Sequence, residues 1–124
     1  MAGKASSETI FLRVHVAPEI SIGPGKADLL EGIRSTGSIA AAGRQLGMSY
    51  KRAWHLIEAL NGHFAAPLVV SSKGGASGGG ATLTELGLEV LQLYREMQLA
   101  AEKAIAPSLR KLRRRSVLDM SGRK

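Results

Sequence analysis

Two short helical segments of the chain are separated by one three-residue turn, and this spacing limits the folds available to it. The segment SIAAAGRQL, residues 38–46, is followed by GMS and then by a helical pattern over residues 50–64. Gly47 can adopt the left-handed conformation that a sharp reversal needs, while Ser38 and Ser49 are suited to cap the helices that follow them. Two short helices joined by a glycine-containing turn are typical of the helix-turn-helix unit.

The segments on either side of this unit favour a winged helix. Residues 10–22 alternate apolar and polar side chains and predict a strand that bends or forms a short hairpin at Pro18. A helix is expected next, from residue 26 to residue 35, with Leu29, Leu30 and Ile33 on its apolar side and Gly37 at its end. The runs PLVVSS and ATLT predict two short strands around GGASGGG, residues 74–80, which holds five of the fifteen glycines. A hairpin directly after the third helix forms a wing, which we expect over residues 73–81.

A strong helical pattern begins at Thr84, a candidate N-cap, and we expect the helix to kink or end at Pro107. The apolar residues Leu86, Val90, Leu93 and Met97 keep helical spacing. This stripe can pack against a second subunit or cover its own domain, and the pattern fits both uses.

The sequence therefore predicts a mainly α fold with a small β component, a winged helix-turn-helix with a long C-terminal helix. We expect three regions: a disordered N-terminus at residues 1–9, the winged-helix domain with its long helix at residues 10–106, and a basic C-terminal tail at residues 107–124.

Charge favours a polyanionic partner. The net charge is +7, and seven of the seventeen Lys and Arg residues, against one acidic residue, lie in residues 107–124. Such a tail either contacts phosphates or is a solvated, disordered end. The chain has no cysteine, no apolar run of the roughly 20 residues that span a bilayer, and no apolar segment near its amino terminus. We expect a cytoplasmic protein without membrane contact.

The third helical segment has one apolar face and one basic face. At about 100° per residue, Lys51, Arg52 and His55 lie opposite the apolar side. Base edges in the major groove are contacted from the start of a recognition helix, while the preceding helix crosses the DNA backbone. Lys and Arg contact guanine, and Ser49 or His55 can serve phosphates or bases.

Three further residues complete the expected interface. The hydroxyl of Tyr50 can reach a phosphate, and Ser38 and Arg44 are expected to position the DNA backbone. Trp54 is expected to pack at the junction of the helix and the wing.

Other functions fit the residues poorly. The three histidines fall on separate elements without metal-ligand spacing, and SIGPGKA lacks the first glycine and the Ser or Thr of a phosphate-binding loop. We therefore expect no catalytic residues, no metal and no cofactor. The few scattered aromatic residues disfavour RNA recognition. A winged-helix module used for protein–protein interaction remains the alternative function.

The stretch GSIAAAGRQLGMSYKRAWHLIEALNGHFAAPLV resembles the amino-terminal DNA-binding domain of the ModE-type, molybdate-responsive transcriptional repressors. The resemblance runs from FLRV near Phe11 to about Tyr94, roughly two-thirds of the chain. Its helix-turn-helix part is also similar to LysR-type regulators.

This resemblance implies a winged-helix domain that dimerises through long helices. It implies that residues 49–52, SYKR, begin the recognition helix, that Ser38 begins the helix crossing the backbone, and that Lys73 lies on the wing. Full-length members carry carboxy-terminal molybdate-binding modules, whereas this sequence stops at Lys124, so we carry over DNA binding from the resemblance and do not carry over molybdate sensing.

The expected function is a sequence-specific DNA-binding transcriptional regulator, a repressor. It would bind double-stranded operator DNA as a homodimer, through a recognition helix at residues 49–62 and the glycine-rich wing. A separate effector-binding protein is a further expected type of partner.

Overall fold

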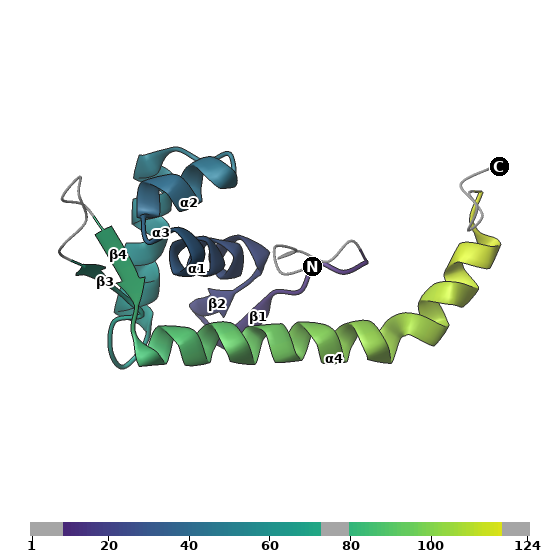
Figure 1. Cartoon of the computed structure of the whole chain (residues 1–124). Helices are drawn as coiled ribbons and strands as arrows, with labels where there is room; N and C mark the ends of the chain where they lie inside the picture. The colour runs from purple at the N-terminus through teal and green to yellow at the C-terminus, as the bar shows by residue number, and fades with distance from the viewer. Residues whose placement is uncertain (1–8, 73–79, 118–124) are drawn as a thin grey trace. The chain divides into compact units, whose positions relative to one another are not determined.

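The computed structural model describes residues 9–72 and 80–117, and the fold class is the one predicted. The chain divides into two compact units, residues 1–94 and 95–124, and each is described by itself. The elements, labelled in Figure 1, are β1 (Val14–Ala17), β2 (Ile20–Ile22), α1 (Pro24–Thr36), α2 (Ile39–Gln45), α3 (Tyr50–His63), β3 (Val69–Ser72), β4 (Gly80–Leu83) and α4 (Glu85–Arg115). Residues 1–8 of the N-terminus predicted to be disordered (residues 1–9), and residues 73–79 of the predicted wing (residues 73–81), lie outside the described residues.

The predicted interruption at Pro18 is confirmed as a hairpin. β1 and β2 pair antiparallel, with Val14 opposite Ile22, and the register shifts between His15 and Ala17. Proline lacks the N–H that a strand needs for its ladder, so the chain turns there.

The core of the first unit is formed by apolar faces of three helices. The expected apolar sides of α1 and α3 are confirmed, because they supply most of the fully buried side chains. Burial of such side chains is the main favourable contribution to folding. The buried helical residues include Ala27, Leu29, Leu30, Ile33, Ala42, Ala53, Ile57 and Leu60.

The turns that orient these helices have the predicted chemistry. Gly37 and Gly47 are both left-handed, with φ of 74° and 72°. The hydroxyl of Ser38 accepts a hydrogen bond from the Ala41 N–H (3.0 Å), and that of Ser49 from the Arg52 N–H (3.1 Å). Each serine satisfies one of the unpaired N–H groups at a helix start.

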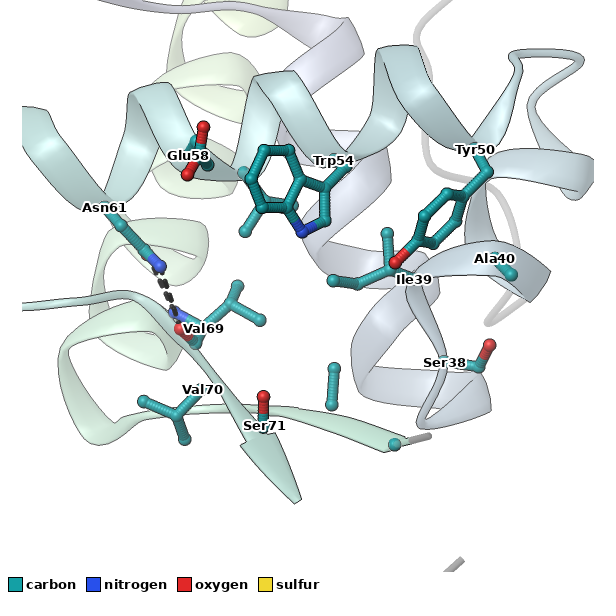
Figure 2. Close-up of a pocket in the computed structure, with 13 residues that line it drawn as sticks. Ser38, Ile39, Ala40, Tyr50, Trp54, Glu58, Asn61, Val69, Val70 and Ser71 are labelled. Carbon is teal, nitrogen blue, oxygen red and sulfur yellow. Dashed lines mark hydrogen bonds between the residues drawn. The ribbon is translucent and has the colours of Figure 1, made fainter. Parts of the chain in front are cut away.

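A side-chain amide holds the wing against α3. The Oδ1 atom of Asn61 accepts from the N–H groups of Leu68 (2.8 Å) and Val69 (3.1 Å), and its Nδ2 donates to the Val69 carbonyl (2.9 Å). The last of these bonds is drawn in Figure 2. β3 pairs antiparallel with β4, and the Ala81 N–H donates to the Gly37 carbonyl (2.9 Å). The base of the wing is therefore fixed to both α3 and the turn before α2.

The start of α4 packs on this base. The predicted cap is confirmed, since the Thr84 hydroxyl accepts from the Gly87 N–H (3.0 Å) and donates to the Pro67 carbonyl (2.8 Å). A Cβ atom at Gly87 would lie 2.2 Å from the Leu68 carbonyl oxygen, so only glycine fits there. Further along α4, Tyr94 is fully buried and its hydroxyl donates to the Leu12 carbonyl (2.7 Å).

Of the two outcomes expected at Pro107, a kink or an end of the long helix, the end was wrong. α4 continues through Pro107 to Arg115, so residues 107–115 are helical and do not form a separate tail. Proline removes one backbone N–H from the helix, but the run SLRKLRRR that follows consists mainly of good helix formers. Cations in the last turn also interact favourably with the helix dipole.

We predict that Asn61→Ala lowers the free energy of unfolding by about 1–3 kcal/mol, because it leaves backbone groups at the start of β3 without partners. Urea unfolding followed by circular dichroism measures this. Glu58→Ala, an exposed change on the same helix, is the matched control and should have little effect. Equal stability of the two variants would contradict the role assigned to Asn61.

Candidate nucleic-acid interface

The first two turns of α3 present five of the predicted residues together on the surface. Lys51, Arg52 and His55 are exposed, and Ala53 and Ile57 on the opposite side are buried. Ser49, the N-cap, and Tyr50, the first helical residue, are also exposed. The arrangement offers two cations, an imidazole and two hydroxyl groups along one helix start.

The other predicted residues are distributed differently. Ser38 is half-buried at the start of α2 and lines the same pocket as Tyr50. Arg44 is exposed in the last turn of α2. Lys73 lies outside the described residues. The structure thus brings Ser38 close to the start of α3, while Arg44 lies at the other end of α2.

Two cations that the sequence reasoning missed line a surface depression with Arg52. Arg13, the residue before β1, and Lys26 of α1 border this depression, which has a volume of 240 Å³. Lys26 donates to the Ser21 carbonyl (2.9 Å). Burial lowers the pKa of Lys26 below its ordinary value, and the nearby Arg13 charge lowers it further. The basic surface therefore extends from α3 to the start of α1.

These cations have no acidic counterparts. Within residues 9–72 and 80–117, Arg13, Lys26, Lys51 and Arg52 form no salt bridge, whereas Arg34 pairs with Glu31. A cation that is not paired with a carboxylate keeps its charge available to a phosphate. The electrostatics thus favour a polyanion on this side of the domain.

Trp54 lies at the junction of α3 and the wing, as predicted, but it is 40% exposed and not a fully packed residue. Its indole meets the His55 ring edge-on, with centroids 5.9 Å apart. It borders a pocket of 370 Å³ between α3, the start of α2 and the strands of the wing. Figure 2 shows the side chains of Trp54 and Tyr50 extending from α3 over this pocket.

Neither a metal-binding cluster nor a membrane-spanning helix is found in the described part of the chain. Residues 9–72 and 80–117 contain no group of three His, Asp or Glu side chains arranged to hold a metal ion. None of the helices described there combines the length and apolar character needed to cross a bilayer.

Three helices, a β-hairpin wing and an unpaired basic face at the third helix define a winged helix-turn-helix DNA-binding domain.

Residues 27–88, half of the chain, match the family model described as bacterial regulatory helix-turn-helix protein, lysR family. The chain therefore belongs to the LysR family of bacterial regulatory helix-turn-helix proteins. The match places the helix-turn-helix domain of these regulatory proteins within residues 27–88.

Curated relatives confirm the resemblance to ModE-type domains. The chain is 40% identical over 85 residues to the molybdenum-pterin-binding protein MopB of Rhodobacter capsulatus, covering 68% of this chain and 32% of MopB. It is 36% identical over 95 residues to the transcriptional regulator ModE of Haemophilus influenzae, covering 77% of this chain and 37% of that protein. The chain spans about a third of the length of these relatives.

A solved structure shows the same fold. The ArgP protein of Mycobacterium tuberculosis superposes with a TM-score of 0.52 at 22% sequence identity, over 68% of this chain and 30% of that one. At this identity the likeness concerns the fold alone.

We predict that Lys26→Ala weakens DNA binding uniformly across sequences and flattens the slope of log K against log salt by about 0.9, as expected for one lost phosphate contact. The change should also raise the free energy of unfolding of the free domain, because burial and Arg13 disfavour the charged form of Lys26. This gain should shrink as the pH rises through the lowered pKa of Lys26. Fluorescence anisotropy at several salt concentrations measures the slope. Arg34→Ala, on the same helix but already paired with Glu31, should leave it unchanged.

Proposed function

We propose that this chain binds operator DNA in a sequence-specific manner and regulates transcription as a repressor, with α3 in the major groove. The observation that carries the proposal is the unpaired basic start of α3, where Ser49, Tyr50, Lys51, Arg52 and His55 are all exposed. Side chains at the start of a recognition helix are the ones that reach base edges. Occupation of an operator is sufficient for repression, and the protein acts where genomic DNA lies, in the cytoplasm.

Each residue has an expected role. Lys51 and Arg52 have the donors that match guanine N7 and O6, and Ser49 and His55 serve bases or phosphates. Tyr50, Ser38 and Arg44 position the domain on the backbone, together with Lys73 of the wing. Base contacts supply the sequence preference, and phosphate contacts supply most of the affinity and its salt dependence.

A role in protein–protein interaction is less well supported. Protein interfaces are depleted of charged residues at their core and enriched in aromatic and apolar ones. The exposed face of α3 instead has Lys51, Arg52 and His55 side by side, and none of the three forms an ion pair with a carboxylate in the described residues.

We predict that Arg52→Ala or Lys51→Ala costs about 1–3 kcal/mol of operator affinity and relaxes the preference at one base position, if the side chain contacts a base. Affinities for the operator and for single-base variants of it, measured at one salt concentration, test this. An equal loss on every sequence would reassign the residue to a phosphate contact.

The proposal includes a two-fold dimer through α4. On the first turns of α4, Leu86 and Val90 are half-buried against the core, whereas Leu93 on the same side is 48% exposed. In the second unit, Met97, which continues this side of the helix, is 39% exposed. An exposed apolar stripe on a helix is suited to meet its own copy, and a symmetric dimer matches a palindromic operator with half-sites about 34 Å apart.

We predict that Leu93→Glu shifts the protein to a monomer and weakens operator binding, because two like charges would meet at the two-fold axis. Leu88→Glu is the control, since Leu88 is 44% exposed on the other flank of the same helix. Gel filtration with light scattering at micromolar concentration measures both. A wild-type protein that is already a clean monomer would remove the dimer from the proposal.

The experiment that tests the function itself is selection of genomic DNA fragments by the pure protein at two salt concentrations, followed by sequencing. We expect a shared palindromic motif that survives the higher salt. Binding that is uniform, lost with salt and without a motif would contradict sequence-specific recognition.

A further inference from the structure

We propose that the pocket between α3 and the wing seats one sugar–phosphate backbone of the bound DNA, and that Trp54 is a backbone-contacting residue. The inference rests on the proposed operator binding and adds a contact surface to it. Neither Trp54 nor Ser71 is among the interface residues expected from the sequence pattern.

The pocket has walls on two elements of the expected interface. Tyr50 and Trp54 form one side from α3, Ser71 and Ala81 form the other from the wing strands, and Ile39 of α2 lies between them. Its volume is 370 Å³. In Figure 2 the Trp54 indole and the Tyr50 phenol extend from α3 toward the wing, and the Ser71 side chain points back toward α3.

Three hydrogen-bond donors on these walls are available. The indole N–H of Trp54 and the hydroxyls of Tyr50 and Ser71 donate to no protein acceptor in the described part of the chain. Trp54 is 40% exposed and Tyr50 is 57% exposed, so a partner can reach them. An indole N–H can only donate, and its natural partner is an acceptor.

The geometry of duplex DNA supplies that acceptor. If α3 lies in the major groove and the wing approaches the neighbouring minor groove, one backbone must pass between them, because a single strand separates two adjacent grooves. Phosphate oxygens are acceptors and take hydrogen bonds from neutral side chains as well as cations. The apolar edges of Trp54 and Ile39 suit the deoxyribose that lies between phosphates.

Glu58 limits how far the DNA backbone can extend over the pocket. It lines the same pocket one turn beyond Trp54, is exposed, and has no cation paired with it in the described residues. A carboxylate repels a phosphate, so the backbone lies toward Tyr50 and Trp54. Glu58→Gln should therefore strengthen DNA binding by a few-fold at low salt and have less effect at high salt.

Trp54 is the chain's single tryptophan, and its fluorescence therefore reports on this pocket alone. We expect acrylamide to quench the free protein readily and to quench it several-fold less once a short duplex is bound. Quenching that is unchanged with DNA bound would leave Trp54 in water and overturn the proposal. Failure of the protein to bind DNA at all would instead overturn the proposed function.

A variant separates a backbone contact from a base contact. Trp54→Phe keeps an aromatic ring and removes the N–H, and should weaken binding about tenfold on operator and unrelated DNA alike, since a hydrogen bond to a charged group is lost. The salt slope should not change, because no cation is removed. Leu88→Ala, on α4, is the control for a change at an equally exposed apolar site.

Duplexes with one neutral methylphosphonate identify the phosphate. The wild-type protein should lose affinity at one position next to the half-site, and Trp54→Phe should be insensitive to that position alone. Circular dichroism and thermal unfolding verify that the variant is folded. Equal affinities of wild type and Trp54→Phe, or identical sensitivity to every methylphosphonate, would overturn the inference.

Discussion

The amide of Asn61 is the interaction on which the interface geometry depends. One side chain satisfies two N–H groups and one carbonyl at the start of β3, and so fixes the wing at a set distance from α3. A buried strand end without such partners would lose about 1–3 kcal/mol per unpaired group. Because Asn61 is on α3 itself, the position of the wing follows that of α3. Asn61 itself lines the pocket beside Trp54, so the same side chain that holds the wing on α3 also borders the space between them.

The basic face shows that stability and binding have opposite requirements here. Lys26 is partly desolvated and lies near Arg13, and both features disfavour its charge in the free domain. A neighbouring carboxylate would relieve this, yet it would also repel DNA. The described part of the domain instead leaves Arg13, Lys26, Lys51 and Arg52 without acidic partners. A bound phosphate would stabilise the charge on Lys26 that burial and Arg13 disfavour in the free protein. Relief of this repulsion would then contribute to the binding free energy.

Local chemistry made the helix boundaries predictable from the sequence. Gly37, Gly47, Ser38 and Ser49 act within a few residues of their own positions, and each was found in the expected conformation or hydrogen bond. The convergence of Arg13 and Lys26 with Arg52 was not predictable in this way, because those residues come from separate elements and meet only through the tertiary fold.

Single residues without a periodic pattern were missed for the same reason. An isolated asparagine such as Asn61 resembles any surface residue in sequence. Tyr94 was not expected in the core, because it lies outside the apolar stripe of α4 that includes its neighbour Leu93. Pro107 misled in the other direction, because a proline is unfavourable in a helix but strong helix formers around it can outweigh one lost hydrogen bond.

The apolar stripe of α4 explains how one helix can serve both a core and a partner. Leu86 and Val90 pack on the first unit, whereas Leu93, one turn further, is largely exposed beside the buried Tyr94. Burying an exposed leucine gains about 1.5–3 kcal/mol, so the few exposed apolar side chains of this helix favour a dimer of modest affinity. Two half-sites on one duplex would hold two copies at high effective concentration. Under the proposed function, dimerisation and operator binding are therefore coupled, and each strengthens the other.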